Sequence, residues 1–107
     1  MNDSDAVKAL AALAQANRLA VFRLLVVAGP DGLSVGSIAE ALGLANATLS
    51  FHLKELTNAG LIASRQEGRF IYYSASMSKM NALIGFLTEN CCQGMPGLCE
   101  PASSRKC

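Results

Sequence analysis

Residues 46–60 read NATLSFHLKELTNAG, and this stretch decides how the rest of the chain is interpreted. Asn46 can cap a helix by accepting a hydrogen bond from a free backbone amide. Gly60 easily takes the left-handed conformation that ends a helix. Between them, three leucines recur at helical spacing and predict one buried face: Leu49, Leu53 and Leu56.

The opposite face of this predicted helix is small, polar or singly basic. It carries Ala47, Phe51, Lys54 and Asn58, with Thr48 and Ser50 on its flanks. Side chains of these kinds include groups that hydrogen-bond base edges and phosphates, which favours a helix that enters a DNA groove. A solvated surface helix carries a similar face, so the neighbouring elements must decide between the two interpretations.

The residues before this helix predict a second, shorter helix over 34–42. Its apolar positions point inward at helical spacing: Val35, Ile38, Ala39 and Leu42. Ser37 and Glu40 fit the capping-box pattern, and Ser34 is the alternative cap. Gly43 ends the helix and leads within two residues into the next one. Two helices joined by a tight, glycine-containing turn predict a helix-turn-helix.

After Gly60 the hydrophobic period changes from helix to strand. Residues 61–66 and 69–74 predict two antiparallel strands around a tight turn at Glu67 and Gly68. A hairpin directly after a helix-turn-helix is a wing, and Arg69 at its tip is predicted to reach the DNA backbone or minor groove. The alternative is that Arg65 and Arg69 form a cross-strand pair with Glu67.

Two helices are predicted before the helix-turn-helix. Residues 4–14 form an alanine-rich helix whose apolar side packs either in a dimer interface or in the core; this side holds Val7, Leu10, Ala11 and Ala14. Residues 17–28, capped by Asn17 or a neighbour, bury Leu19, Phe22, Leu25 and Val26, with Arg18 and Arg23 facing away. The turn at 29–32, which reads GPDG, ends this helix.

A last helix is predicted from a cap at Ser78 to about Asn90. Its apolar stripe is spaced as in a seam between two helices: Met80, Leu83, Ile84 and Leu87. The expected fold is therefore mainly α with a β-hairpin wing, in which four helices precede the hairpin and a fifth follows it. The expected division is a winged helix-turn-helix and dimerisation domain over 1–90 and a flexible, cysteine-containing tail over 91–107.

The composition is that of one folded domain, and it also limits which kinds of partner the chain is expected to bind. Of 107 residues, 51% are hydrophobic and 16% charged, so part of the apolar surface is expected to close a subunit interface. The net charge of +1 predicts few phosphate contacts per subunit. The chain start lacks the pattern of a signal peptide and no apolar run is long enough to cross a membrane, which predicts a cytoplasmic protein with no membrane partner.

All four cysteines lie in the last seventeen residues: Cys91, Cys92, Cys99 and Cys107. No CxxC pair is present, which excludes a thioredoxin-like motif and a paired zinc knuckle. Three thiolates without a nearby histidine suit a thiophilic, three-coordinate ion better than tetrahedral zinc. Cys107 as a fourth ligand keeps zinc or cadmium open. His52, far from the thiols, is interpreted as partly packed or close to DNA.

Residues 33–74 resemble the winged helix-turn-helix of the ArsR/SmtB family of metal- and metalloid-responsive repressors. The most specific part is SFHLKEL over 50–56, followed by AGLI over 59–62 and the Gly68–Arg69 turn. The resemblance extends upstream through 12–25, ALAQANRLAVFRLL, and so covers nearly all of the chain before the tail. It implies a homodimer, formed by the first and last helices, that binds an operator and is released by a metal or metalloid.

The resemblance also bears on the effector. The third-helix cysteine box and the last-helix zinc site of the family are both missing here, since 35–42 has no cysteine and no histidine follows His52. What is similar is a cysteine pair after the last helix with a third cysteine downstream, as in some arsenite-responsive members. This implies that Cys91, Cys92 and Cys99 bind trivalent arsenic, and implies no role for Cys107.

The expected function is therefore repression of an arsenic-resistance operon, relieved by arsenite or antimonite. The residues predicted to contact DNA are Asn46, Thr48, Ser50, Phe51, His52, Lys54 and Arg69. One alternative keeps the winged helix and changes the signal to cadmium, lead, zinc or thiol oxidation. Another is a metal-buffering protein whose winged helix binds only proteins. With one histidine and no convergent acid–base set, an enzyme is not expected.

Overall fold

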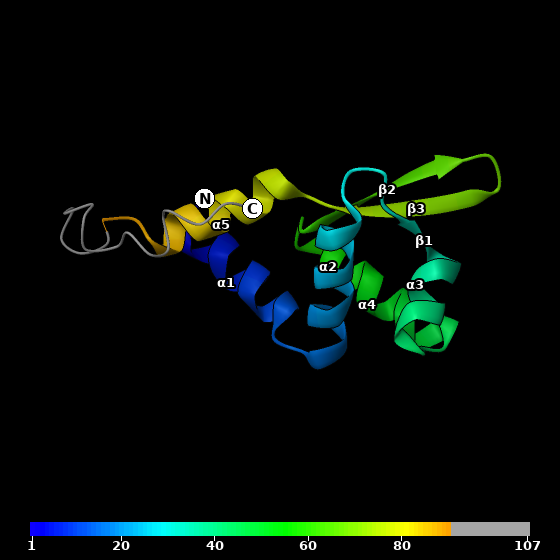
Figure 1. Cartoon of the computed structure of the whole chain (residues 1–107). Coiled ribbons are helices and arrows are strands. Elements are labelled where there is room, and N and C mark those ends of the chain that lie inside the picture. The colour runs from blue at the N-terminus through cyan, green and yellow to red at the C-terminus, as the bar shows by residue number, and fades with distance from the viewer. Residues whose placement is uncertain (91–107) are drawn as a thin grey trace.

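The computed structural model describes residues 1–90, which form five helices and one three-stranded antiparallel sheet (Figure 1). In chain order the elements are α1 (Asp3–Leu13), α2 (Ala16–Ala28), β1 (Leu33–Ser34), α3 (Val35–Leu42), α4 (Asn46–Asn58), β2 (Ile62–Glu67), β3 (Phe70–Ala75) and α5 (Met77–Leu87). This is the expected mainly helical fold with a hairpin wing. The tail predicted over 91–107 lies outside the described residues.

The sheet contains a strand that the sequence pattern does not predict. The strand order is β1-β3-β2, with Leu33 opposite Tyr73 and Ser34 opposite Tyr72. The two residues of β1 are too few to show alternation, so their strand character comes from pairing with β3. They join the wing to the start of α3 and thereby fix the wing beside the helix-turn-helix.

The wing turn lies one residue later than predicted. Glu67 pairs with Phe70, so the two-residue turn is Gly68 and Arg69 and not Glu67 and Gly68. Gly68 has a φ of 62°, in the left-handed region that short hairpin turns require. The shift places Arg69 in the turn itself.

Two helix caps lie two positions before the residues predicted for them. Gln15 caps α2 by accepting a hydrogen bond from the Arg18 amide at 2.9 Å, in place of Asn17. Ser76 caps α5 by accepting from the Lys79 amide, in place of Ser78. In each case the helix begins earlier than the choice of the preferred cap residue predicts.

The start of α3 resolves the choice between two serines. Ser34 is the cap, since its Oγ accepts from the Ser37 amide at 3.2 Å. The capping-box interpretation of Ser37 and Glu40 is therefore wrong, because Ser37 already lies in the first turn of the helix. Gly43 ends α3 in the left-handed conformation with a φ of 65°, as expected.

The core is centred on α2 and α4, with contributions from α3, β2 and α5. The predicted stripe of α4 is buried, as are the central residues of α2 and the residues that enter β2. The largest fully buried side chains are Val21, Leu25, Ile38, Leu49, Leu56 and Leu61. The predicted stripe of α2 is wrong at Leu19, which is exposed, while Val21 takes its place in the core.

Helices α1 and α5 contact each other at one end of the molecule, away from the wing (Figure 1). The side of α1 that enters the core is made of Ala6, Ala9 and Ala12. Val7, 65% exposed, and Leu10 lie outside the core, so core packing of this predicted stripe is wrong. On α5, Leu83 is buried while other apolar residues are exposed: Met77, Ile84 and Leu87.

Within residues 1–90, no single helix has the length and hydropathy needed to span a membrane. The α1–α2 pair meets that length and composition test only as two helices bent by 100°.

Candidate nucleic-acid interface

Helices α3 and α4 form a helix-turn-helix with a three-residue connection, residues 43–45. The turn is closed by a hydrogen bond from the Leu44 amide to the carbonyl oxygen of Ala39 at 3.1 Å. The two helices contact each other, and Ile38 of α3 and Leu49 of α4 are both fully buried in the same core. Burying one face of α4 in this way leaves its other face in solvent.

All the residues of α4 that are predicted to contact DNA are exposed, except His52. Asn46, Thr48, Ser50 and Lys54 are exposed polar residues, and Phe51 is 56% exposed. A hydroxyl or amide can hydrogen-bond a base edge, an ammonium can pair with a phosphate, and an aromatic ring can contact a thymine methyl group. The face therefore carries every kind of contact that a reading helix needs.

Asn46 is free for such a contact because it does not cap its helix. The residue in the cap position is Ala45, which has no side-chain cap hydrogen bond, and Asn46 is the first residue of α4. The prediction that Asn46 caps the helix is wrong. Its side chain makes no hydrogen bond within residues 1–90 and is exposed at the helix N-terminus, where the free amides also favour an anion.

His52 does not lie on the exposed face. It is 6% exposed and packs beside the buried leucines, with its ring 5.6 Å from that of Phe51 at an angle of 62°. Its Nδ1 lies 3.5 Å from Nη1 of Arg18. The placement of His52 among residues that face DNA is therefore wrong, because its ring points toward α2.

The Arg65 side chain is held within the protein by three contacts. Its Nε donates to Oε2 of Glu67 at 3.0 Å, and its Nη2 donates to the carbonyl oxygen of Asp31 at 3.1 Å. Its guanidinium also lies 5.2 Å from the centre of the Tyr72 ring. The pair with Glu67 runs along one strand and is not the cross-strand pair that was the alternative prediction.

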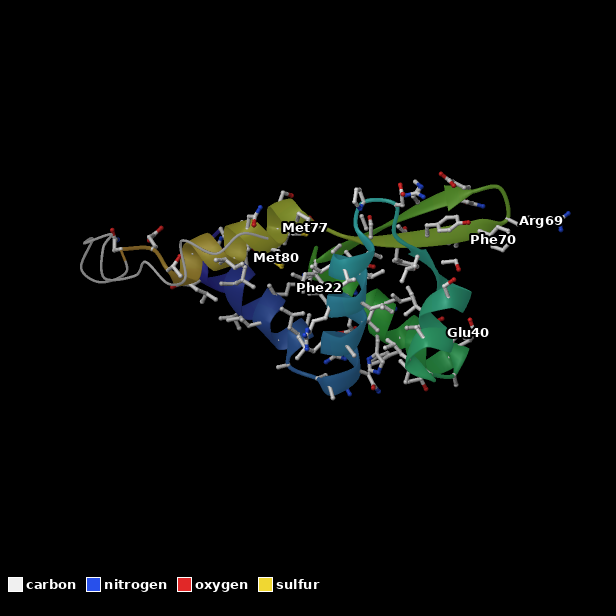
Figure 2. The ribbon with its side chains drawn as sticks, viewed as in Figure 1. Phe22, Glu40, Arg69, Phe70, Met77 and Met80 are labelled. Atoms are coloured by element: carbon white, nitrogen blue, oxygen red, sulfur yellow. The ribbon has the colours of Figure 1, made fainter. Side chains whose placement is uncertain are left out.

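Arg69 has no ion pair among the described residues and extends outward from the tip of the wing (Figure 2). Beside it, Phe70 and Ile71 are exposed. These three residues and the start of α3, from Ser34 to Gly36, line a shallow hollow of about 280 Å³. The hollow itself is mostly apolar, and the cation beside it is the group here that can contact a phosphate.

Two residues near this interface were not predicted. Arg18 was expected to face away from the core but is half-buried and contacts His52. Its partner is 34 positions away, and no local pattern reports such a contact. Phe70 is an exposed aromatic side chain at the wing tip, and the strand alternation around it gave no separate signal for a contact role.

The predicted metal ligands Cys91, Cys92 and Cys99, together with Cys107, lie outside the described residues. Within residues 1–90, no three His, Asp or Glu side chains come together as a metal site.

The chain is similar in sequence to several regulators, including the three that follow. The transcriptional activator HlyU of Vibrio cholerae is 34% identical over 92 residues, which cover 86% of this chain and 82% of HlyU. A Staphylococcus aureus homologue of the cadmium resistance regulator CadC is 31% identical and covers 78% and 67%. A Halobacterium salinarum protein that carries the name of an arsenical resistance operon repressor, ArsR, is 34% identical and covers 66% and 54%.

Solved structures of similar regulators have the same fold as this chain. An ArsR-like regulator of Rhodococcus sp. RHA1 superposes with a TM-score of 0.70 at 27% identity, covering 78% of this chain and 76% of its own. Reduced HlyU of V. cholerae has a TM-score of 0.66 at 34% identity, covering 85% and 93%. The homodimeric DNA-binding domain of Mycobacterium bovis Mb0332, a possible ArsR-family regulator, has a TM-score of 0.66 at 27% identity, covering 84% and 89%.

A protein-family profile described as a helix-turn-helix domain matches residues 13–65, which include α2, α3, α4 and the start of the wing. The sequence relatives reported above are named as transcriptional regulators, and none of them is an enzyme. With the helix-turn-helix, the wing and the exposed reading face described above, these similarities show that the chain belongs to the ArsR/SmtB family of winged helix-turn-helix DNA-binding transcriptional regulators.

Proposed function

We propose that this regulator is a cytoplasmic homodimer that represses an arsenic-resistance operon and leaves its operator when trivalent arsenic or antimony binds Cys91, Cys92 and Cys99. The observation that carries the proposal is the cysteine pair Cys91 and Cys92. In the sequence, three residues separate this pair from the end of α5 at Leu87. Three thiolates form a donor set for a soft, three-coordinate ion. The named arsenical-resistance relative supports the same effector class.

Binding to DNA uses both ends of the molecule in this proposal. The exposed apolar residues of α1 and α5 pair with those of a second copy, as supported by the homodimeric relative. The two α4 helices then enter successive major grooves about 34 Å apart. Asn46, Thr48, Ser50 and Phe51 reach bases, while Lys54 and Arg69 contact phosphates.

Release follows from a change at the dimer end. Gathering three thiolates around one ion restrains the chain immediately after α5, which contacts α1. A shift of α5 against its dimer partner changes the relative placement of the two α4 helices and lowers operator affinity. The ion acts only by its different affinity for the two arrangements.

A second function is favoured by specific relatives. The same winged helix would be released from DNA by cadmium, as the name of the CadC homologue suggests, or by oxidation of the cysteine pair. HlyU is named an activator, so the direction of regulation is a separate question from DNA binding. In this version the tail cysteines remain the sensor and only the signal differs.

Fluorescence anisotropy on a duplex from the chain's own upstream region tests these proposals at one stated salt concentration. Arsenite is expected to release the reduced protein from this duplex at ion concentrations near those of the protein. Cadmium, and peroxide with metals chelated, are the parallel titrations. Release by peroxide or cadmium but not arsenite would contradict the arsenic proposal, and absence of any preference for the duplex would contradict repression through it.

A further inference from the structure

The Arg18 side chain occupies the elbow between α1 and α2. Its Nε donates to the carbonyl oxygen of Ala12 at 2.7 Å, and its own amide donates to Oε1 of Gln15 at 2.9 Å. Ala12 lies in the last turn of α1, where carbonyl oxygens have no partner within the helix. A cation at this helix end is also favoured by the helix dipole, so the guanidinium is anchored firmly on α1.

The other side of the same guanidinium contacts the reading helix. Its Nη1 lies 3.5 Å from Nδ1 of His52, at the long end of hydrogen-bond distances. The nitrogen of a neutral imidazole accepts a bond here if the ring proton is on Nε2. Because the guanidinium is planar and rigid, one group touching both partners sets the position of α4 relative to the end of α1.

Helices α1 and α4 also contact each other directly, and on α1 the buried side chains are alanines. Between the two helices is an open groove of about 460 Å³, in which Arg18 lies. Its α1 wall is Lys8, Ala11 and Ala12, and its α4 wall includes Glu55 and Asn58. Ala59 completes the lining, and Ala12 and Ala59 are buried in the core, whereas the rest of the groove is open. Alanines interdigitate less than larger side chains, so packing alone restrains the angle between α1 and α4 less than a core of large residues would.

We propose that Arg18 is a positioning residue that holds the reading helix α4 at a fixed angle to the dimer-end helix α1, through His52 and the carbonyl oxygen of Ala12. The inference rests on the proposed function, a dimer that reads two grooves at once. In such a dimer a small rotation of α4 against α1 is repeated in both subunits, and the two helices no longer match the spacing of the DNA. Arg18 then governs specific binding without touching DNA.

The test compares wild type with Arg18→Lys and Arg18→Gln, and uses Arg23→Lys as the matched control on the exposed side of the same helix. Lysine keeps the charge but lacks the planar guanidinium, so it cannot contact the Ala12 carbonyl oxygen and His52 at the same time in the same geometry. We expect Arg18→Lys to weaken binding to the upstream duplex about tenfold, which corresponds to about 1.4 kcal/mol. Binding to a scrambled duplex should change less than about twofold, because non-specific binding depends on phosphate contacts alone.

Three further readouts separate positioning from other roles. The slope of log affinity against log salt should be unchanged in Arg18→Lys, since a lost phosphate contact lowers it by about one. Thermal unfolding and the dimer's sedimentation should also match wild type. Arg23→Lys should match wild type in all five measurements.

His52 supplies an independent check. His52→Asn keeps an acceptor near the position of Nδ1 and should bind the upstream duplex like wild type, whereas His52→Leu should lose affinity as Arg18→Lys does. Combined with Arg18→Lys, His52→Leu should add little further loss, because both changes remove one link.

Three outcomes would overturn the positioning role. They are wild-type affinity in Arg18→Lys, an equal loss on both duplexes with a smaller salt slope, and fully additive losses in the double variant. Among the results of this test, only the absence of any preference of the wild-type protein for the upstream duplex would overturn the proposed function as well.

Discussion

At the scale of single residues, two basic side chains stand out on the exposed reading surface. Lys54 lies on the exposed face of α4, and Arg69 extends from the wing tip without an ion pair among the described residues (Figure 2). Arg65, by contrast, is engaged by Glu67 and the Asp31 carbonyl. Basic residues that are already paired have less to gain from a phosphate than those that are free.

Replacing Lys54 or Arg69 with glutamine is therefore expected to weaken binding to all duplexes alike. Each change should also lower the salt slope by about one, because one phosphate contact is lost. Titrations of the upstream duplex at several salt concentrations measure both effects. Arg23→Gln, an equal charge change on α2, is the control, and an identical effect from it would show that overall charge is responsible.

Phe51 is expected to behave differently from the basic residues. Its exposed ring can bury apolar surface against a base but carries no charge. Phe51→Ala should reduce affinity about fivefold, near 1 kcal/mol, with no change in the salt slope. A loss of slope, or a lowered melting temperature from its contact with His52, would contradict a direct contact with bases.

At the scale of elements, β1 attaches the wing to the helix-turn-helix, and Gly32 lies immediately before it. Gly32 has a φ of 73°, and an added Cβ would collide with the carbonyl oxygen of Tyr73 in β3. Gly29 has a similar φ of 82° with open space around the same position. An alanine at Gly29 therefore introduces backbone strain alone, whereas an alanine at Gly32 adds a steric clash with β3.

Gly29→Ala is expected to cost about 1–3 kcal/mol of folding free energy, because a φ of 82° with a ψ of −166° is a backbone conformation that essentially only glycine adopts. Gly32→Ala should cost about 1–3 kcal/mol more, because β1 must move away from β3. Urea unfolding at one protein concentration measures both. Equal losses would show that the close approach of Gly32 to β3 does not hold the wing in place.

The exposed apolar residues of α1 and α5 form the second element-scale feature. Ile84→Glu is expected to raise the dimer dissociation constant at least about a hundredfold, since burying an unpaired carboxylate costs about 3 kcal/mol or more. Sedimentation equilibrium measures this. Val27→Glu is the matched control, because Val27 is 84% exposed on α2, outside the α1–α5 face. A dimer that survives Ile84→Glu would contradict the interface.

At the scale of the whole molecule, the reading elements and the α1–α5 end lie at different ends of the fold (Figure 1). In the proposed switch, an effector held by the cysteines that follow α5 in the sequence acts on DNA affinity through the packing of the helices. Thermodynamic linkage makes this coupling reciprocal. If arsenite weakens DNA binding about a hundredfold, on the order of 3 kcal/mol, DNA must weaken arsenite binding by the same factor.

Cysteine variants are expected to separate the sensor from the reader. The double variant Cys91→Ser/Cys92→Ser should keep wild-type affinity for the upstream duplex but show no release by arsenite, because the thiolate ligands are lost. Cys107→Ser is the control and should respond like wild type. Loss of DNA binding in the double variant would mean that the tail is part of the fold, contrary to the proposed switch.

The sequence by itself determined the elements and their approximate order. The leucines of α4, the left-handed glycine after α3 and the alternation of the wing are local patterns, because each records interactions between residues a few positions apart. These patterns were enough to predict a winged helix-turn-helix and, apart from His52, the exposed face of α4. Caps shifted by one or two residues, since several neighbouring side chains could serve.

Only the tertiary structure decided the rest. Leu33 pairs with Tyr73, and Arg18 meets His52, across separations of 40 and 34 positions that no local period encodes. The same holds for burial, which depends on where a partner element lies. His52 turned inward because α2 packs beside it, and Val7 turned outward because the three alanines of α1 face the core. Long-range packing thus selected which residues of each predicted helix are free to act.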